Sequence, residues 1–257
     1  MNSPSNTAAT LGINSVRSAL KFGSGGVAEL WLDRSRRDRR LAELAALARE
    51  AGVAVRQLDR DALDQAGQGG NHQGALAWVR MPAALTEHDL ERLLDAAEQA
   101  PLLLVLDGVT DPHNLGACLR SADGAGATAV IAPKDKAVGL TPVVVKVASG
   151  AAESVPFVQV TNLARTLDAL KARGIWLIGL ADTAPATLFE TDLSGPTALV
   201  LGSEGSGLRR LTQERCDLLA SLPMRGRVES LNVSVAAGIC LYEVVRRRLS
   251  VPELLNG

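Results

Sequence analysis

The stretch that decides the fold is 199–248, LVLGSEGSGLRRLTQERCDLLASLPMRGRVESLNVSVAAGICLYEVVRRR. It opens as an apolar β-type run and leads directly into a glycine turn, GSEGSG at 202–207, where the backbone can come close to a ligand. A second short apolar piece follows at 220–224, then the polar SLN at 230–232, then a long small-residue helix from about 233. If the two strands are parallel neighbours, their ends and the helix start converge on one spot. That spot is where open α/β sheets bind ligands.

Upstream of this stretch, apolar runs alternate with helical patterns. The predicted strands are 102–106, 127–132, 155–160 and 175–181, and the predicted helices are about 115–124, 141–152 and 163–173. Strands separated by helices at this spacing indicate an α/β fold with a parallel sheet that is covered on both faces. We therefore expect one C-terminal domain over 101–257.

A smaller α/β unit is expected before it, over residues 11–80. Its predicted helices are 13–20, one that opens with 34–40 and ends before Gly52, and 59–66. Its predicted strands are 28–32, 53–58 and 74–79. The polar residues 1–10 are expected to form a flexible tail. Residues 81–100 are expected to be a linker with a helix, opened by the capping box TEHD at 86–89 and running to about Ala100.

Composition limits the class of protein. The 257 residues are 47% hydrophobic and 3% aromatic, which favours closely packed α/β layers. The three cysteines are odd in number and far apart, without a C-x-x-C, which argues against a disulfide framework and a structural zinc site. No signal peptide or membrane span is recognisable, so we expect a cytoplasmic protein without a membrane partner. The net charge of −1 neither indicates nor excludes nucleic acid.

The segment RSRRDRR at 34–40 is a dense basic cluster with five arginines. Such a cluster is either the solvated face of a helix or a patch that contacts phosphates. The sequence leaves both interpretations open.

The segment DPHNLGACLR at 111–120 follows a predicted strand and starts a helix. Helical side chains lean toward the N-terminus, so Arg120 would reach over Gly116, which has no Cβ, toward Asn114. The alternative is that Asn114 only caps the helix and Arg120 only pairs with a surface acid such as Asp123. No Ser/His/Asp order and no metal-ligand spacing is present, so we predict no metal site.

The glycine turn reads G-x-x-G-x-G, which is not the G-x-G-x-x-G order of dinucleotide-binding folds. A Rossmann oxidoreductase is therefore a poor fit. Glu204 within the turn is either an ordinary exposed acid or a group aimed at a ligand hydroxyl or at Arg120. Ser230 and Asn232 are either N-caps of the last helix or ligand contacts.

Taken together, DPHNLGACLR, LGSEGSGL and LPMRGRVESLNVSVAAGI resemble, in order and spacing, the three motifs of the SpoU family of RNA ribose 2′-O-methyltransferases. The flanking segments GINSV at 12–16, HQGALA at 72–77 and AAESVP at 151–156 are similar to one branch of that family. Bacterial enzymes of this branch methylate a guanosine in the peptidyl-transferase P loop of 23S ribosomal RNA. The likeness covers nearly the whole chain.

The resemblance implies a fold, a methyl donor and an RNA partner. The C-terminal domain would contain a deep trefoil knot that binds S-adenosylmethionine in a bent shape, and would form a homodimer. The small N-terminal domain, similar to a ribosomal-protein RNA-binding fold, would grip 23S rRNA. The donor-binding positions implied are Leu201, Gly202, Leu222, Met224, Ser230 and Leu231, and the polar positions implied in catalysis are Asn114, Arg120, Glu204 and Asn232.

These roles suggest a mechanism without a metal, because the sulfonium of the donor already activates the methyl group. A guanidinium keeps its proton at physiological pH, so we expect Arg120 to bind the adjacent phosphate and stabilise the developing alkoxide rather than act as a base. Asn114 would orient Arg120 and the ribose, Glu204 would hold Arg120 or the nucleoside, and Asn232 would fix the donor or hydroxyl geometry. The proton acceptor stays undefined.

Two alternatives to this function remain. One is the same chemistry on transfer RNA, which the presence of the N-terminal unit disfavours. The other is a catalytically silent RNA-binding or ribosome-assembly protein, which the intact Asn114, Arg120 and Glu204 disfavour.

Overall fold

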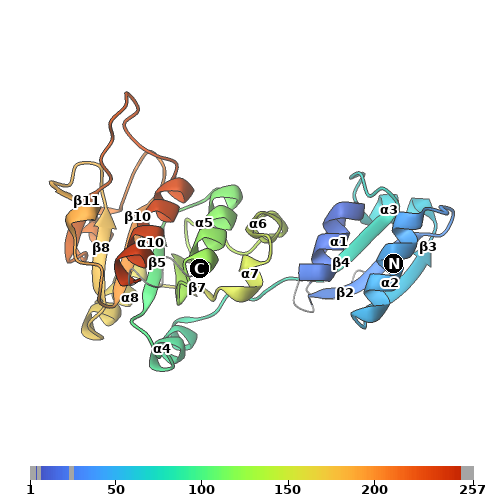
Figure 1. Cartoon of the computed structure of the whole chain (residues 1–257), viewed down its shortest axis with the longest axis horizontal. Helices are drawn as coiled ribbons and strands as arrows, with labels where there is room; N and C mark the ends of the chain where they lie inside the picture. The colour runs from blue at the N-terminus through green and yellow to red at the C-terminus, as the bar shows by residue number, and fades with distance from the viewer. Residues whose placement is uncertain (1–3, 5–6, 23–25, 250–257) are drawn as a thin grey trace. The chain divides into compact units, whose positions relative to one another are not determined.

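A computed structural model of the chain describes residue 4 and residues 7–22 and 26–249 (Figure 1). The chain divides into two compact units, Met1–Pro82 and Ala83–Gly257. No helix of the described residues is long and apolar enough to cross a membrane.

The first unit is a four-stranded mixed sheet in the order β1-β4-β2-β3. Its elements are β1 (Thr7–Leu11), α1 (Ile13–Phe22), β2 (Val27–Asp33), α2 (Arg39–Glu50), β3 (Ala54–Leu58), α3 (Arg60–Ala66) and β4 (Ala75–Arg80). Apolar residues of α1 and α2 pack on one sheet face, and Leu63 of α3 packs with Trp31 and Trp78 on the other. The predicted alternation of this unit is therefore present.

Two local predictions in this unit were wrong. Residues 7–10, expected in a flexible tail, belong to β1, which pairs antiparallel with β4. The small residues of TAATL show no alternation of apolar and polar residues, so the sequence gives no sign of a strand. Pairing with β4 holds these residues in an extended conformation. Helix α2 begins at Arg39, because Asp38 is its N-cap and accepts a hydrogen bond from the backbone N–H of Arg40. The arginines at 34–37 therefore precede the helix instead of opening it.

The second unit is built on a seven-stranded sheet in the order β7-β6-β5-β10-β8-β11-β9, in which every strand pair is parallel. Its elements are α4 (Glu87–Asp95), β5 (Leu102–Asp107), α5 (Pro112–Gly124), β6 (Ala129–Pro133), α6 (Pro142–Ala148), α7 (Ala151–Ser154), β7 (Phe157–Val160), α8 (Leu163–Ala172), β8 (Trp176–Leu180), β9 (Ala186–Thr187), the 3₁₀ helix η1 (Leu188–Glu190), β10 (Thr197–Gly202), α9 (Arg210–Gln213), β11 (Leu218–Ser221) and α10 (Val233–Arg248). The predicted parallel α/β fold is confirmed.

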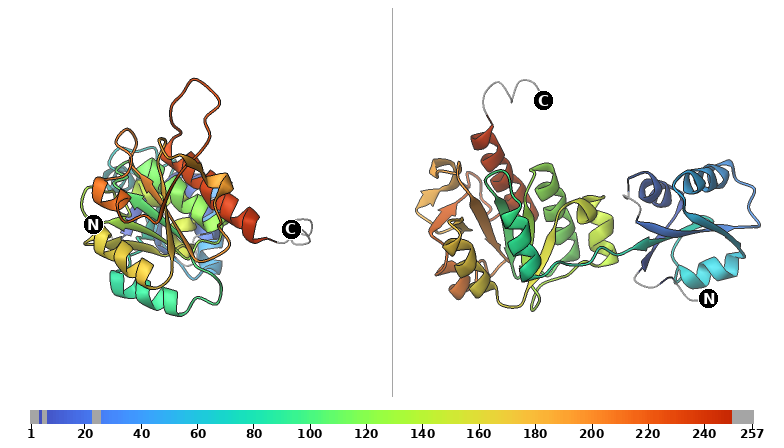
Figure 2. Two further views of the ribbon diagram at one scale, coloured as in Figure 1. Left: turned by 90° about the vertical axis from the view of Figure 1, so that its left-hand side faces the viewer. Right: turned by 90° about the horizontal axis from the view of Figure 1, so that it is seen from below.

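Helices cover both faces of this sheet, as Figure 2 shows. Successive strand residues point to opposite faces, so Leu104 and Leu106 pack in one core with α5, α6, α7 and α10. Leu103 and Val105 pack in a second core with α4 and α8. This double covering explains why β5 is apolar at every position before Asp107.

Three further predictions in this unit need correction. Helix α4 ends at Asp95, not near Ala100. Residues 83–100, expected to be a linker, belong to the second unit, because Leu85 bridges Val158 of β7. The helix predicted over 141–152 is interrupted, because Ser149 and Gly150 both have positive φ (53° and 102°) and separate α6 from α7.

The strand register aligns three chain turns at one edge of the sheet, which we call the carboxyl edge. Gly202 pairs with Asp107, and Val200 lies level with Gly179 of β8 and Leu219 of β11. The last residues of β5, β10 and β11 therefore end at the same height. The loop from β11 to α10, 222–232, extends beyond this edge (Figure 1).

Candidate functional site

Three polar side chains from distant parts of the chain meet at the carboxyl edge. Asn114 lies in the first turn of α5, Glu204 lies in the glycine turn after β10, and Asn232 is the N-cap of α10. All three were predicted site residues, and the structure brings them together.

Glu204 Oε1 is the centre of this group. It accepts hydrogen bonds from Asn114 Nδ2 at 3.0 Å, from Asn232 Nδ2 at 2.6 Å and from the backbone N–H of Val233 at 3.4 Å. Asn232 Nδ2 also donates to Asn114 Oδ1 at 2.9 Å. A carboxylate at a helix N-terminus interacts favourably with the helix dipole, so this position suits the charge of Glu204. We call Asn114, Glu204 and Asn232 the polar triad.

Helix capping fixes two members of the triad. In α5 the N-cap is Asp111, which accepts a hydrogen bond from the backbone N–H of His113, so Asn114 is free for Glu204. The suggestion that Asn114 only caps the helix was wrong. In α10 the N-cap is Asn232, whose Oδ1 accepts from the N–H of Ser234 at 2.9 Å, and Ser230 does not cap the helix. Asn114 is 8% exposed and is therefore largely enclosed by protein atoms.

The glycine turn is a small closed loop. Ser203 and Gly207 exchange backbone hydrogen bonds of 3.2 and 3.0 Å, and the hydroxyls of Ser203 and Ser206 lie 2.5 Å apart. A Cβ on Gly202 would overlap the backbone of Gly207 and Leu208, so only glycine fits there. The glycines therefore let the chain fold back on itself and present Glu204 to the triad.

Arg120 is not a member of the triad. Six residues of helix rotate a side chain by about 600°, so Arg120 lies about a third of a turn away from Asn114 and about 9 Å along the axis. The route over Gly116 is closed, since a Cβ there would lie 2.6 Å from Cβ of Val147 in α6. The predicted reach of Arg120 across Gly116 to Asn114 was therefore wrong. Arg120 is exposed, and within the described residues it has no hydrogen bond or ion pair, including the suggested pair with Asp123.

The predicted donor-binding residues lie at the carboxyl edge and in the loop beyond it. Leu201 is buried at the end of β10, and Leu222, directly after β11, packs on the same apolar core. Met224 and Leu231 are half-buried, whereas Ser230 is exposed. β8 separates β10 from β11, so Gly202 and Leu222 lie about 10 Å apart across the edge. That span suits a nucleoside-sized ligand.

Sequence reasoning missed a buried ion pair beside the glycine turn. Asp107, the last residue of β5, has a side chain with 0% exposure. It accepts hydrogen bonds from the backbone N–H of Arg209 at 3.0 Å and from Arg209 Nε at 2.5 Å. An acid that ends an all-apolar strand was the signal that could have indicated this pair.

The cysteines take no part in the site. Burial raises the pKa of the thiols of Cys118, Cys216 and Cys240 to about 12, and all three are free. Among the described residues, no group of three or more His, Cys, Asp or Glu is placed to hold a metal ion.

The basic segment at 34–40 is largely paired with acids of its own unit. Arg34 pairs with Asp59, Arg36 and Arg40 pair with Asp38, and Arg39 pairs with Glu43. Arg37 is the member of the cluster for which the described residues offer no partner. Exposed ion pairs of this kind contribute little, so the structure leaves phosphate contact by this segment open.

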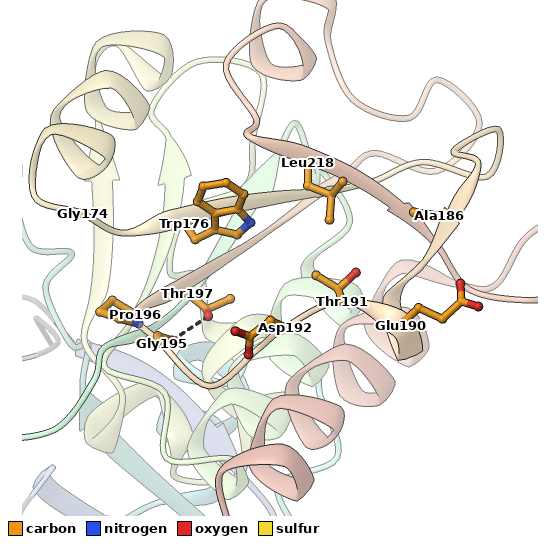
Figure 3. A pocket seen from close by; sticks show the side chains of 10 residues that line it. All are labelled: Gly174, Trp176, Ala186, Glu190, Thr191, Asp192, Gly195, Pro196, Thr197 and Leu218. Carbon is orange, nitrogen blue, oxygen red and sulfur yellow. Dashed lines mark hydrogen bonds between the residues drawn. The ribbon is translucent and has the colours of Figure 1, made fainter.

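A cavity of about 530 Å³ lies at the opposite, amino edge of the sheet (Figure 3). Trp176, Thr197 and Leu218, the first residues of β8, β10 and β11, line it, and Trp176 is 50% exposed. Parallel α/β sheets bind ligands at the ends of strands, not at their beginnings. We therefore locate the functional site by the triad and not by this cavity.

Comparisons with known proteins identify the family of the chain. Residues 101–242 match the model of the SpoU rRNA Methylase family, and residues 11–84 match a model described as RNA 2′-O ribose methyltransferase substrate binding. The 23S rRNA (guanosine-2′-O-)-methyltransferase RlmB of Shewanella oneidensis is 53% identical over 93% of this chain and 97% of its own length. RlmB of Pseudomonas aeruginosa is 54% identical over 92% of this chain and 95% of its own length.

A solved structure of similar fold contains the methyl donor. The SpoU methyltransferase AviRb from Streptomyces viridochromogenes, in complex with the cofactor AdoMet, superposes with a TM-score of 0.76 at 30% identity. The match covers 95% of this chain and 91% of AviRb. With its parallel sheet, its polar triad and these relatives, the chain belongs to the SpoU rRNA methylase family.

Proposed function

We propose that this protein transfers a methyl group from S-adenosylmethionine to the ribose 2′-hydroxyl of a guanosine in 23S rRNA. The observation that carries the proposal is the polar triad, built from the three motifs at the carboxyl edge of the sheet. The RlmB relatives, which match over nearly the whole chain, support guanosine and 23S rRNA as the substrate.

The carboxyl edge fits the donor chemically. Leu222, Met224 and Leu231 offer half-buried apolar side chains for a nucleoside, and the turn at Gly202 offers backbone. We assign donor binding to these residues together with Leu201 and Ser230, in the knotted arrangement that family membership implies. When bound, the donor supplies a methyl group already activated by its sulfonium.

The triad would position the acceptor ribose. Glu204 Oε1 is held by Asn114 and Asn232, while Oε2 accepts no hydrogen bond from the described residues. Glu204 can therefore offer Oε2 to a ribose hydroxyl from a fixed position. Fixing the hydroxyl in line with the methyl supplies much of the rate in such a transfer, because it removes the entropy cost of orientation.

Arg120 would bind RNA phosphate. Its guanidinium is exposed and has no acid partner within the described residues, so no ion pair must break before a phosphate binds. Next to the reacting ribose, this charge also stabilises the developing alkoxide. The role does not require contact between Arg120 and Asn114.

The N-terminal unit would hold the RNA. The match of residues 11–84 to a substrate-binding model supports this role, and we assign residues 101–257 to methyl transfer. The protein would act in the cytoplasm, where ribosomal RNA is its substrate.

The C-terminal unit would also form a homodimer. Val235, Ile239 and Tyr242 lie on one side of α10 at helical spacing, with exposures of 49%, 37% and 52%. Exposed apolar side chains in one stripe are typical of a protein interface. We call these three residues the α10 stripe and propose that the stripes of two chains pack together.

Mapping of ribose methylation tests the proposed substrate. Primer extension on 23S rRNA, with transfer RNA probed in parallel, compares cells that have the protein with cells that lack it. We expect the primer-extension product to stop at one guanosine of 23S rRNA in cells that have the protein. This stop should be absent from cells that lack the protein and should return when the gene is supplied. A protein-dependent stop in transfer RNA alone would overturn the choice of substrate, and no dependent stop in either RNA would favour a silent RNA-binding protein.

A further inference from the structure

The glycine turn that carries Glu204 has few anchors of its own. Residues 203–207 lie at the surface, and their backbone hydrogen bonds join Ser203 to Gly207 within the loop. On one side the turn is continuous with β10. On the other side Leu208 packs on an apolar core, and Glu204 itself bonds to Asn114 and Asn232. The exposed main chain after Leu208 needs a further anchor, because a surface loop with few packing contacts opens at little cost.

The polar anchor that follows Leu208 is the pair of Asp107 and Arg209. Asp107 belongs to β5 and lies beside Gly202 in the sheet register, so its position is fixed by the sheet. Its Oδ2 receives the backbone N–H of Arg209 at 3.0 Å, and its Oδ1 receives Nε of Arg209 at 2.5 Å and also contacts Nη2. One carboxylate thus holds both the main chain and the side chain of the residue that ends the turn.

The pair is unequally buried. The side chain of Asp107 is 0% exposed and that of Arg209 is 46% exposed. Removing one partner of a buried ion pair is costly because the remaining charge loses its compensation, whereas an exposed pair contributes little. Arg210 offers the contrast, since it pairs with Glu214 at the surface, one residue further along.

We infer that Asp107 and Arg209 are positioning residues for methyl transfer: they clamp the end of the glycine turn and so hold Glu204 in the polar triad. Neither residue touches the triad, and both act through the turn. The inference rests on the proposed function of the triad but concerns residues outside the three family motifs quoted above.

The first test measures the turn itself and requires no activity. Hydrogen–deuterium exchange of the free protein compares wild type with Arg209→Met and with Arg210→Met. We expect faster exchange in 203–208 for Arg209→Met only, with exchange in β5 and β10 unchanged. Equal exchange of 203–208 in wild type and Arg209→Met would overturn the clamp.

The second test measures function with S-adenosylmethionine and 23S rRNA. Displacing a catalytic group by about 1 Å can cost roughly 100-fold in rate, so we expect kcat of Arg209→Met to fall roughly 10-fold to 100-fold. Affinity for S-adenosylmethionine should change much less, because β10 still fixes Gly202. Arg209→Lys should recover part of kcat, and Arg210→Met should match wild type.

A double variant separates positioning from general destabilisation. If Arg209 acts through Glu204, Arg209→Met should reduce kcat little further in a Glu204→Gln background. If the fold loss of kcat in the double variant equals the product of the losses in the two single variants, the two residues act independently. That result would overturn the inference, even with both single variants impaired. A wild-type protein that transfers no methyl group would refute the proposed function, while the exchange experiment would still decide whether the clamp exists.

Discussion

Single residues determine whether the site can form, and Asn114 is the most constrained of them. It is buried, it donates to Glu204 and it accepts from Asn232. Each member of the triad hydrogen-bonds to both others, but Glu204 and Asn232 are exposed, whereas Asn114 is buried. We therefore expect the buried amide of Asn114 to limit how far the triad can shift.

Replacing Asn114 tests this constraint. We expect Asn114→Ala to lower kcat by roughly 100-fold or more, the loss typical of removing one preorganised polar contact. The binding constant for S-adenosylmethionine, measured by calorimetry, should change little because the donor is assigned to other residues. His113→Ala, at the neighbouring exposed position, is the matched control. An active Asn114→Ala protein would contradict the role of the triad.

The sequence predicted the members of the triad but not how Arg120 lies. The resemblance to the SpoU motifs implied Asn114, Glu204 and Asn232, whereas the residue patterns alone left capping or surface roles open for them. The reach of Arg120 depended on an empty face at Gly116, and sequence patterns cannot say which helix fills such a face. The structure fills it with α6, so tertiary packing overrode a correct local rule about side-chain direction.

At the level of secondary-structure elements, the contact between helices α5 and α6 depends on one glycine. Gly116 is the contact point of α5 with α6: a Cβ there would lie 2.6 Å from Val147 Cβ and 2.9 Å from the Val144 carbonyl oxygen. The second neighbour is backbone and cannot rotate away. Close contact between these helices therefore requires glycine.

Gly116→Ala should destabilise the C-terminal unit. Because the Val144 carbonyl oxygen is backbone and cannot move aside, we expect an overpacking cost near the upper end of about 1–3 kcal/mol, above the gain of about 1 kcal/mol from replacing glycine with alanine in a helix. Urea unfolding should show the loss. Gly195→Ala should be neutral by the same measurement, because nothing lies within 4 Å of its added Cβ. Equal stability of the two variants would refute the packing argument.

Helix α4 offers a pH-dependent prediction. Hydrogen bonds from the backbone and side chain of Thr86, and then from Arg92, lower the pKa of Asp89 from 3.8 to about 2. A depressed pKa means that the ionised form stabilises the folded state above pH 3.8 and that this contribution is lost as the pH falls toward about 2.

The measurement compares urea unfolding of wild type and Asp89→Asn. Wild type should be the more stable protein at pH 6, and the difference should shrink as the pH falls below 3.8. Glu98→Gln, an exposed acid without a partner among the described residues, is the control. A difference that stays constant with pH would exclude the capping box as its origin.

The sequence predicted the buried apolar strands well. It predicted poorly the short edge strands, which are ordered only by pairing with a neighbouring strand. The strands β5, β6, β8 and β10 are buried on both faces, and their apolar runs reveal them. β1 and β9 are short edge strands of small residues, and their order comes from a neighbouring strand. No local pattern could have indicated them.

Two copies of the whole chain are expected to form a dimer through the α10 stripe. Tyr242→Asp places a charge in the proposed interface, so light scattering should change from a mass of twice 26.9 kDa to the mass of one chain. Leu211→Asp, at an exposed apolar position of α9, should leave the mass unchanged. A monomeric wild type, or a dimer that survives Tyr242→Asp, would contradict this interface.

The carboxyl edge of the sheet, with its polar triad, is the proposed site of methyl transfer. The most direct measurement incubates purified protein with radiolabelled S-adenosylmethionine and 23S rRNA, digests the RNA and identifies the labelled nucleoside. We predict label in 2′-O-methylguanosine for wild type and for Trp176→Ala at the amino edge, and less than about 1% of that label for Glu204→Gln. Full labelling with Glu204→Gln, or loss of labelling with Trp176→Ala in a folded protein, would contradict this proposal.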